Sequence, residues 1–266
     1  MLLAWEHHQA NDVAEIAMKI EYLELGANRR IAFERNPGKA PEIMFLGGFR
    51  SDMSGTKAEH LAEYCKRHGY AYTRFDYRGH GASSAAFEDG CIGDWADDAV
   101  QVFDQVTQGP AILIGSSMGG WMMLLVARQR LARIKGLIGI AAAPDFTEEL
   151  IFADFDERQK QTLQDEGIVY LPSQYGEPDP ITRRLIEDGR NHLLLRSPIA
   201  IDCPVHLLQG QEDPDVPWRT ALRLGERLTG RDVTIELIKD GDHRLSRDPD
   251  LGRLSDTLDR MIARTG

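Results

Sequence analysis

The sequence predicts an α/β fold built on a mostly parallel, eight-stranded sheet flanked by helices. Short aliphatic runs alternate with amphipathic helical stretches over most of the 266 residues, and these runs end in Gly, Asp or small residues. Apolar strands that alternate with helices are typical of a parallel sheet covered on both faces. With 42% hydrophobic and 27% charged residues, the chain is long enough for one large core with an inserted subdomain.

The eight strands follow from the hydrophobic runs. Residues 19–25 and 30–34, joined through "GANR", predict an antiparallel hairpin at the edge of the sheet. The remaining strands are predicted at "EIMFLGG", "YAYTRFD", "AILIGS", "KGLIGIAAA", "PVHLLQG" and "DVTIELIKDG".

The helices between the strands have start and stop signals. Thr56 and Glu59 predict a capping box for the helix after the third strand, and Gly69 predicts its left-handed end. Asp94 is expected to cap the next helix, whose apolar stripe ends before "GP".

Residues 144–198 interrupt the alternation. This stretch combines acidic helical patterns with "YLPSQYGEPDP", and it contains no convincing strand. An insertion of this length is commonly a lid over an active site. We therefore expect a helical cap subdomain at 144–198 over the carboxyl edge of a core domain formed by 1–143 and 199–266.

The stretch "ILIGSSMGGWMM" contains the pattern G-x-S-x-G in the form Gly115, Ser117 and Gly119. It stands where a predicted strand must turn abruptly into a helix. A serine at such a turn has a strained backbone, and the flanking glycines let neighbouring chain approach closely. Ser117 is therefore the predicted nucleophile, whereas Ser116 occupies a variable position of the pattern.

A serine nucleophile needs a histidine base and a carboxylate that orients the imidazole. In hydrolases with this elbow the chain order is serine, acid, histidine, and His243 follows the last predicted strand. His80 in "RGHG" is the rival, but it precedes the serine. The other histidines are interpreted as ordinary surface or core residues: His7, His8, His60, His68, His192 and His206.

The acid is expected in the loop "LLQGQEDPDVPW", after the seventh strand. Asp213 fits the arrangement G-x-x-D-x-x-V-P, and it is our choice over Glu212 and Asp215. Asp242 is a further alternative, although it would point away if its neighbour His243 faced the serine.

Acyl transfer also needs N–H donors for the developing oxyanion. Met118, directly after the nucleophile, offers its backbone N–H at a helix N-terminus. Phe49, after the double glycine of "FLGGFRSDMSG", is the best match for the second backbone donor.

Charge and motifs argue against several other functions. The formal net charge of -11 repels polyanions, so neither nucleic acid nor an anionic membrane is an expected partner. Cys65, Cys91 and Cys203 fit neither a zinc site nor a disulfide framework, and "FDYRGHGAS" lacks the Walker lysine of a phosphate loop. We expect no metal and no cofactor.

No long apolar run predicts a membrane-spanning helix, and the N-terminal stretch carries Glu6, Asp12 and Glu15 without a basic lead. That composition is not typical of a secretory or import leader. We therefore expect a cytoplasmic protein without membrane insertion, and the sequence leaves its oligomeric state open.

From Phe45 to Arg244 the chain resembles the α/β-hydrolase superfamily of serine hydrolases. It is most similar to the mitochondrial acyl-protein thioesterase group that also cleaves acyl glucuronides such as that of mycophenolic acid. The resemblance is carried by "MSGTKA", "RFDYRGHG", "GSSMGGWMML", "LIGIAAA", "LPSQYGE", "LLLRSPIAIDCPVHLLQGQEDPDVPW" and "DHR". Gly47 departs from the His-Gly pair that is usual at the oxyanion loop, which removes a side chain but no backbone donor.

The resemblance implies Ser117, Asp213 and His243 as nucleophile, acid and base, the same residues that position and order select. Without a recognisable import sequence, we expect a bacterial-type relative. The predicted function is hydrolysis of ester or thioester bonds in small-molecule or acylated-protein substrates through an acyl-enzyme.

Three alternatives stay open within the fold. A peptidase, a C–C hydrolase or a haloperoxidase could use the same serine elbow, whereas dehalogenases and epoxide hydrolases need a carboxylate at that position. A binding protein that has kept the fold without catalysis is the alternative outside enzymes, and it would be favoured by a missing triad member.

Overall fold

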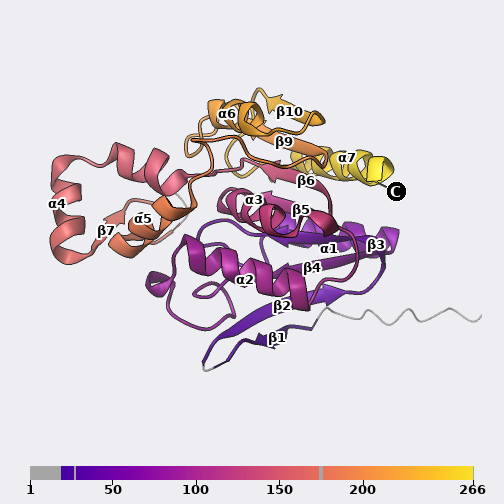
Figure 1. Ribbon diagram of the computed structural model, residues 1–266, viewed down its shortest axis with the longest axis horizontal. Helices are drawn as coiled ribbons and strands as arrows, with labels where there is room; N and C mark the ends of the chain where they lie inside the picture. The colour runs from indigo at the N-terminus through magenta and orange to yellow at the C-terminus, as the bar shows by residue number, and fades with distance from the viewer. Residues whose placement is uncertain (1–18, 27, 174–175, 266) are drawn as a thin grey trace, which may run out of the picture.

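One eight-stranded sheet organises the computed structural model, which describes residues 19–26, 28–173 and 176–265 (Figure 1). The strands are β1 (Glu21–Glu24), β2 (Arg30–Asn36), β3 (Lys39–Leu46), β4 (Tyr70–Phe75), β5 (Ala111–Ser116), β6 (Ile134–Ile140), β9 (Val205–Gly210) and β10 (Val233–Ile238). Their order in the sheet is β1-β2-β4-β3-β5-β6-β9-β10. All eight strands predicted from the hydrophobic runs are confirmed.

The sheet is parallel from β4 to β10, and only β1 and β2 run antiparallel to their neighbours. The predicted edge hairpin is therefore correct. Because parallel strands share one carboxyl edge, the loops after β3, β5, β9 and β10 all open on the same side of the sheet.

Alternate residues of the central strands face two hydrophobic cores. Ile43 of β3 and Ile112 of β5 pack beneath α1 (Thr56–His68) and α7 (Asp248–Thr265). Their neighbours Met44 and Leu113 face the opposite core, beneath α2 (Ile92–Gln105), α3 (Met118–Arg130) and α6 (Arg219–Arg227). This alternation explains why the central strands read as unbroken apolar runs.

The helix ends agree only in part with the predicted caps. Gly69 ends α1 in the left-handed conformation, with φ 74°, as predicted. The capping box at Thr56 is wrong, because Gly55 is the N-cap and the Glu59 carboxylate instead pairs with Arg74 at 2.6 Å.

Asp94 is also not a cap, because α2 begins two residues earlier with Cys91 as its N-cap. Its carboxylate lies 2.7 Å from both Arg78 and Arg184. Two guanidinium groups bind a carboxylate more strongly than a backbone N–H does, so the ion pairs take precedence over a cap.

The insertion, residues 144–198, projects from the sheet between β6 and β9 (Figure 1). It contains α4 (Glu157–Glu166) and α5 (Arg183–Gly189), but also an antiparallel pair of strands, β7 (Ile168–Leu171) and β8 (Asp179–Thr182). The expectation of a segment without strands is therefore wrong. β7 is the short apolar run "IVYL", directly before Pro172, and β8 is "DPIT", with Pro180 inside it. Runs of only four residues beside or around a proline are weak strand signals.

Two sequence interpretations lie outside the described residues. They are the N-terminal stretch 1–18, considered for a leader, and positions 174–175 of "LPSQYGE". Within the ranges that the structure describes, none of the helices has the length and apolar character needed to span a bilayer.

Candidate active site

Ser117 lies at the turn between β5 and α3. Its φ of 54° and ψ of -119° place it in a region that residues other than glycine rarely adopt. Two hydrogen bonds to the end of β6 and the loop after it fix this conformation. The Ser117 N–H donates to the Ile140 carbonyl at 2.9 Å, and the Ser117 carbonyl accepts the Ala143 N–H at 3.0 Å. The strained conformation points to a functional residue, since strain of this kind collects at active sites.

The two glycines of the pattern allow this turn. A Cβ on Gly115 would lie 2.3 Å from the Gly119 carbonyl oxygen, and a Cβ on Gly119 would lie 2.0 Å from the Leu46 carbonyl oxygen. Helix α3 thus begins in contact with the end of β3. Only glycine fits at either position, and the contact brings the serine close to the loop after β3.

The structure brings together the three side chains that the sequence selected. His243 Nε2 lies 3.1 Å from Ser117 Oγ, and His243 Nδ1 lies 2.9 Å from Asp213 Oδ2. The serine follows β5, the aspartate β9 and the histidine β10, so the shared carboxyl edge of three strands assembles the group. This is the geometry of a nucleophile hydrogen-bonded to a base, which an acid orients.

Asp213 has a fully buried side chain with every oxygen occupied. Its Oδ1 accepts the N–H groups of Asp215 and Val216 at 2.9 and 2.8 Å, and its Oδ2 accepts the Gln209 side-chain N–H at 3.0 Å. These bonds offset the cost of burying the carboxylate and fix the oxygen that faces His243.

Sequence reasoning did not find Gln209. It lies inside a buried strand, and its side chain donates both to Asp213 and to the Val216 carbonyl, at 3.1 Å. The available signal was a fully polar side chain one position before the glycine that ends β9, within the run "PVHLLQG".

The rival residues have other contacts. Asp242 accepts the Leu245 N–H at 2.8 Å, within the loop that carries His243. His80 accepts the Arg50 N–H at its Nε2 atom, 3.2 Å away, rather than contacting the serine.

The loop after β3 lies directly beside the serine. A Cβ on Gly48 would lie 3.4 Å from the Cβ of Ser117. The next residue, Phe49, donates no backbone hydrogen bond to the residues that the structure describes. Met118 is the first residue of α3, where backbone N–H groups have no partner within the helix. Both predicted donors therefore stand next to Ser117 with N–H groups that a substrate oxygen could use.

Aromatic rings surround the oxyanion loop. The Phe49 ring packs edge-on against Phe87, Trp95 and Phe146, with centroid separations of 4.9, 5.9 and 5.6 Å. Phe146 belongs to the insertion and also contacts Trp121 of α3, at 5.8 Å. The insertion thus supplies part of the apolar packing around the oxyanion loop.

Asp213, Asp215 and His243 are close enough for their ligand atoms to surround a cation. However, Asp213 already uses both oxygens, and His243 Nδ1 already contacts that carboxylate. A cation there would have to displace these contacts, so the cluster fits the triad arrangement better than a metal centre.

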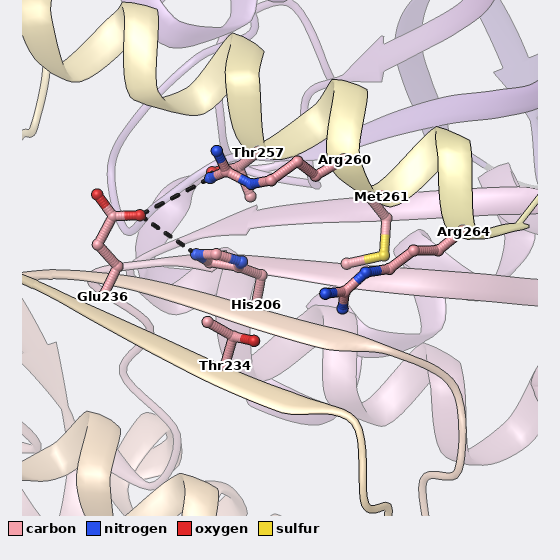
Figure 2. A pocket seen from close by; sticks show the side chains of 7 residues that line it. All are labelled: His206, Thr234, Glu236, Thr257, Arg260, Met261 and Arg264. Atoms are coloured by element: carbon pink, nitrogen blue, oxygen red, sulfur yellow. Dashed lines mark hydrogen bonds and ion pairs between the residues drawn. The ribbon is translucent and has the colours of Figure 1, made fainter.

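A cavity of about 360 Å³ lies between β9, β10 and α7 (Figure 2). His206 lines it at the second residue of β9, whereas Asp213 follows the opposite end of that strand. In Figure 2, His206 and Arg260 both point to Glu236, at 3.5 and 3.8 Å. Arg253 also pairs with Glu236, at 2.9 Å. The cavity is thus lined by ion pairs that converge on Glu236, and it is remote from the serine.

Lys57, in the first turn of α1, holds the loop that carries His243. Its ammonium group donates to the Arg244 carbonyl, and to Ser246 Oγ at 3.2 Å. Burial, with a smaller contribution from the Arg244 charge, lowers the pKa of Lys57 to about 8.

This pKa predicts a pH dependence of stability. Between pH 8 and the ordinary lysine value of 10.5, the unfolded chain binds a proton that the folded chain has lost, so stability rises with pH. We expect the free energy of unfolding of the wild type, minus that of Lys57→Met, to increase across this window and to be flat below it. Urea titrations at a series of pH values measure the difference, and a constant value from pH 7 to 10.5 would contradict the shifted pKa.

Comparison with known proteins agrees with the geometry. A family model described as "Serine aminopeptidase, S33" matches residues 42–175. The human mitochondrial palmitoyl-protein thioesterase ABHD10 is 38% identical over 234 residues, which are 87% of this chain and 76% of that protein.

Solved structures show the same relationship. A structure from Agrobacterium vitis S4 matches with a TM-score of 0.88 and 41% identity, covering 92% of this chain and 98% of that one. Alpha/beta hydrolase domain-containing protein 10 from mouse matches with a TM-score of 0.87 and 36% identity, covering 93% and 100%. The chain therefore belongs to the α/β-hydrolase family that the serine aminopeptidase model describes, and within it to the group of the ABHD10 palmitoyl-protein thioesterases.

Proposed function

We propose that the protein is a serine esterase or thioesterase that works through an acyl-enzyme at Ser117. His243 Nε2 takes the proton from Ser117 Oγ, and Asp213 holds His243 with the proton on Nδ1 and stabilises the imidazolium that forms. The backbone N–H groups of Phe49 and Met118 stabilise the oxyanion.

The reaction proceeds in two halves. Ser117 Oγ bonds to the ester or thioester carbonyl carbon, and the carbonyl electron pair moves onto oxygen. When that pair returns, the bond to the alcohol or thiol breaks, and His243 gives its proton to the departing group. His243 then takes a proton from water, whose oxygen bonds to the acyl carbon. The bond from that carbon to Ser117 Oγ breaks, His243 returns its proton to Oγ, and the carboxylic acid is released.

The single observation that carries this proposal is the hydrogen-bonded chain from Ser117 through His243 to Asp213 at a strained elbow. The names of the relatives, palmitoyl-protein thioesterases, favour acyl substrates. The substrate is then a small acyl ester or an acylated protein.

In the same proposal, the insertion acts as a cap subdomain and the remainder of the chain as the catalytic domain. The contact between Phe146 and Phe49 supports this role, as do the bonds from Arg50, beside the oxyanion loop, to Glu177, Pro178 and Asp179.

The sequence predicts a cytoplasmic location, whereas the relatives are named mitochondrial. Imaging of the tagged full-length chain in its own cells tests it.

A fluorophosphonate probe tests the proposed nucleophile. The folded wild type should form one covalent adduct on Ser117, identified by peptide mass spectrometry, with Ser116 unlabelled. Denatured protein is the control, because the reaction requires the assembled base and oxyanion donors. Absence of an adduct in folded protein would favour a binding protein that has kept the fold.

A substrate panel then separates the enzymatic alternatives. Acyl-thioesters and p-nitrophenyl esters of graded chain length should be hydrolysed, and aminoacyl p-nitroanilides should not. The panel includes the anilides because the family model is described as a serine aminopeptidase. Faster turnover of the anilides than of the esters and thioesters would replace this proposal with a peptidase.

A further inference from the structure

His80 is a buried histidine that the proposed triad does not use. Its side chain is enclosed, with 4% of the residue exposed, and both ring nitrogens have backbone partners. Nδ1 lies 3.1 Å from the Arg78 carbonyl, and Nε2 lies 3.2 Å from the Arg50 N–H. A carbonyl only accepts and an N–H only donates, so the proton must be on Nδ1 and the lone pair on Nε2.

Arg50 needs this support because its backbone is strained. Its φ of 55° lies in the left-handed region, which is unfavourable for a residue with a side chain. The Arg50 N–H belongs to the peptide group that joins it to Phe49. The bond to His80 therefore fixes the plane that follows Phe49, and with it the orientation of the oxyanion loop.

The side chain of Arg50 fixes the same residue from the opposite direction. Its guanidinium donates to the Glu177 and Pro178 carbonyls, both at 2.8 Å, and pairs with Asp179 at 2.9 Å. Arg50 thus joins the oxyanion loop to the beginning of β8 in the insertion, while its backbone is tied to the core through His80.

His80 and Phe49 also share an aromatic environment. The His80 ring packs edge-on against Phe87 and Trp95, with centroids 5.0 and 5.3 Å away, and Phe49 contacts the same two rings. Burial lowers the pKa of His80 to about 4, so the neutral form that can accept the Arg50 N–H prevails at neutral pH.

We propose that His80 is a positioning residue for the oxyanion site: its Nε2 lone pair holds the Phe49–Arg50 peptide and so aims the Phe49 N–H at the substrate carbonyl oxygen. The inference rests on the proposed function, and it assigns to the "RGHG" turn a role in the reaction. His80 itself touches no reacting atom. Its effect is on the transition state, where the oxygen gains charge, more than on substrate binding.

Replacement of His80 by phenylalanine keeps a ring among the aromatic neighbours and removes the acceptor. We expect kcat for a p-nitrophenyl ester to fall by about 10- to 100-fold, with KM changed by less than about twofold, because one oxyanion donor is misaimed rather than lost. Affinity for a trifluoromethyl ketone, which forms an oxyanion adduct with the serine, should fall by the same factor. His80→Gln, which keeps an acceptor oxygen, should recover part of the loss.

His206→Phe is the matched control, because His206 is a partly buried histidine of the remote cavity in Figure 2. It should leave kcat unchanged. Unaltered kinetics in His80→Phe would overturn the proposal. So would a loss of kcat that tracks the loss of thermal stability and that His80→Gln does not relieve, since that pattern describes packing alone.

A measurement without turnover separates this inference from the proposed function. Nitrogen-15 NMR of histidine-labelled wild type should show His80 with a proton on Nδ1 and none on Nε2 at neutral pH, assigned by comparison with His80→Gln. The opposite tautomer would overturn the inference even if Ser117 is the nucleophile. Conversely, hydrolysis by Ser117→Ala at the wild-type rate would refute the proposed function and leave the tautomer result unaffected.

Discussion

Replacement of Ser117 by alanine is expected to lower kcat for ester and thioester hydrolysis by about 10⁴- to 10⁶-fold, the range found when a catalytic serine is removed from a triad. The physical reason is that Oγ forms the covalent bond of the acyl-enzyme, and it is the hydroxyl that lies 3.1 Å from His243 Nε2. Single-turnover and steady-state kinetics on purified protein measure the loss.

Ser116→Ala is the matched control for this substitution. Ser116 precedes the nucleophile in the chain, but it is the last residue of β5, where it is paired with Ile140 as a regular strand residue. Its replacement should change kcat only a few-fold and should leave fluorophosphonate labelling of Ser117 intact. Equal losses in the two variants would mean that the elbow collapses rather than that one hydroxyl is catalytic.

The strands and the candidate triad were accessible from sequence for the same physical reason. Parallel strands buried on both faces must be continuously apolar, so runs such as "AILIGS" stand out, and their carboxyl ends mark where loops gather. Once the strands are located, the serine, the aspartate and the histidine follow as polar residues just beyond three strand ends. Their catalytic roles remain a proposal.

Other features depend on tertiary contacts that one sequence does not display. The strands β7 and β8 have only four residues each and pair only with each other, outside the main sheet. Asp94 is a residue type that often caps helices, but its carboxylate instead pairs with Arg78 and Arg184, which lie in other parts of the chain. His80 likewise accepts the N–H of Arg50, which lies on a separate loop 30 residues earlier in the chain.

Gly119→Ala is expected to lower the free energy of unfolding by at least about 3 kcal/mol, the upper part of the range for overpacking. The added Cβ would lie 2.0 Å from the Leu46 carbonyl oxygen and 2.6 Å from the Gly47 carbonyl oxygen, both backbone atoms of the end of β3. Neither can rotate away as a side chain would, so α3 must move off the sheet. Thermal denaturation should show a decrease in Tm on the order of 10 °C.

The same displacement should reduce activity in whatever fraction stays folded. The Leu46–Gly47 segment leads directly to Phe49, and α3 carries Met118 at its first turn, so both oxyanion donors move relative to Ser117 Oγ. Gly252→Ala in α7 is the control, because a Cβ there meets no atom within 4 Å and alanine favours the helix by up to about 1 kcal/mol. If Gly119→Ala were as stable and as active as Gly252→Ala, the close contact between the elbow and β3 could not be what aligns the two donors.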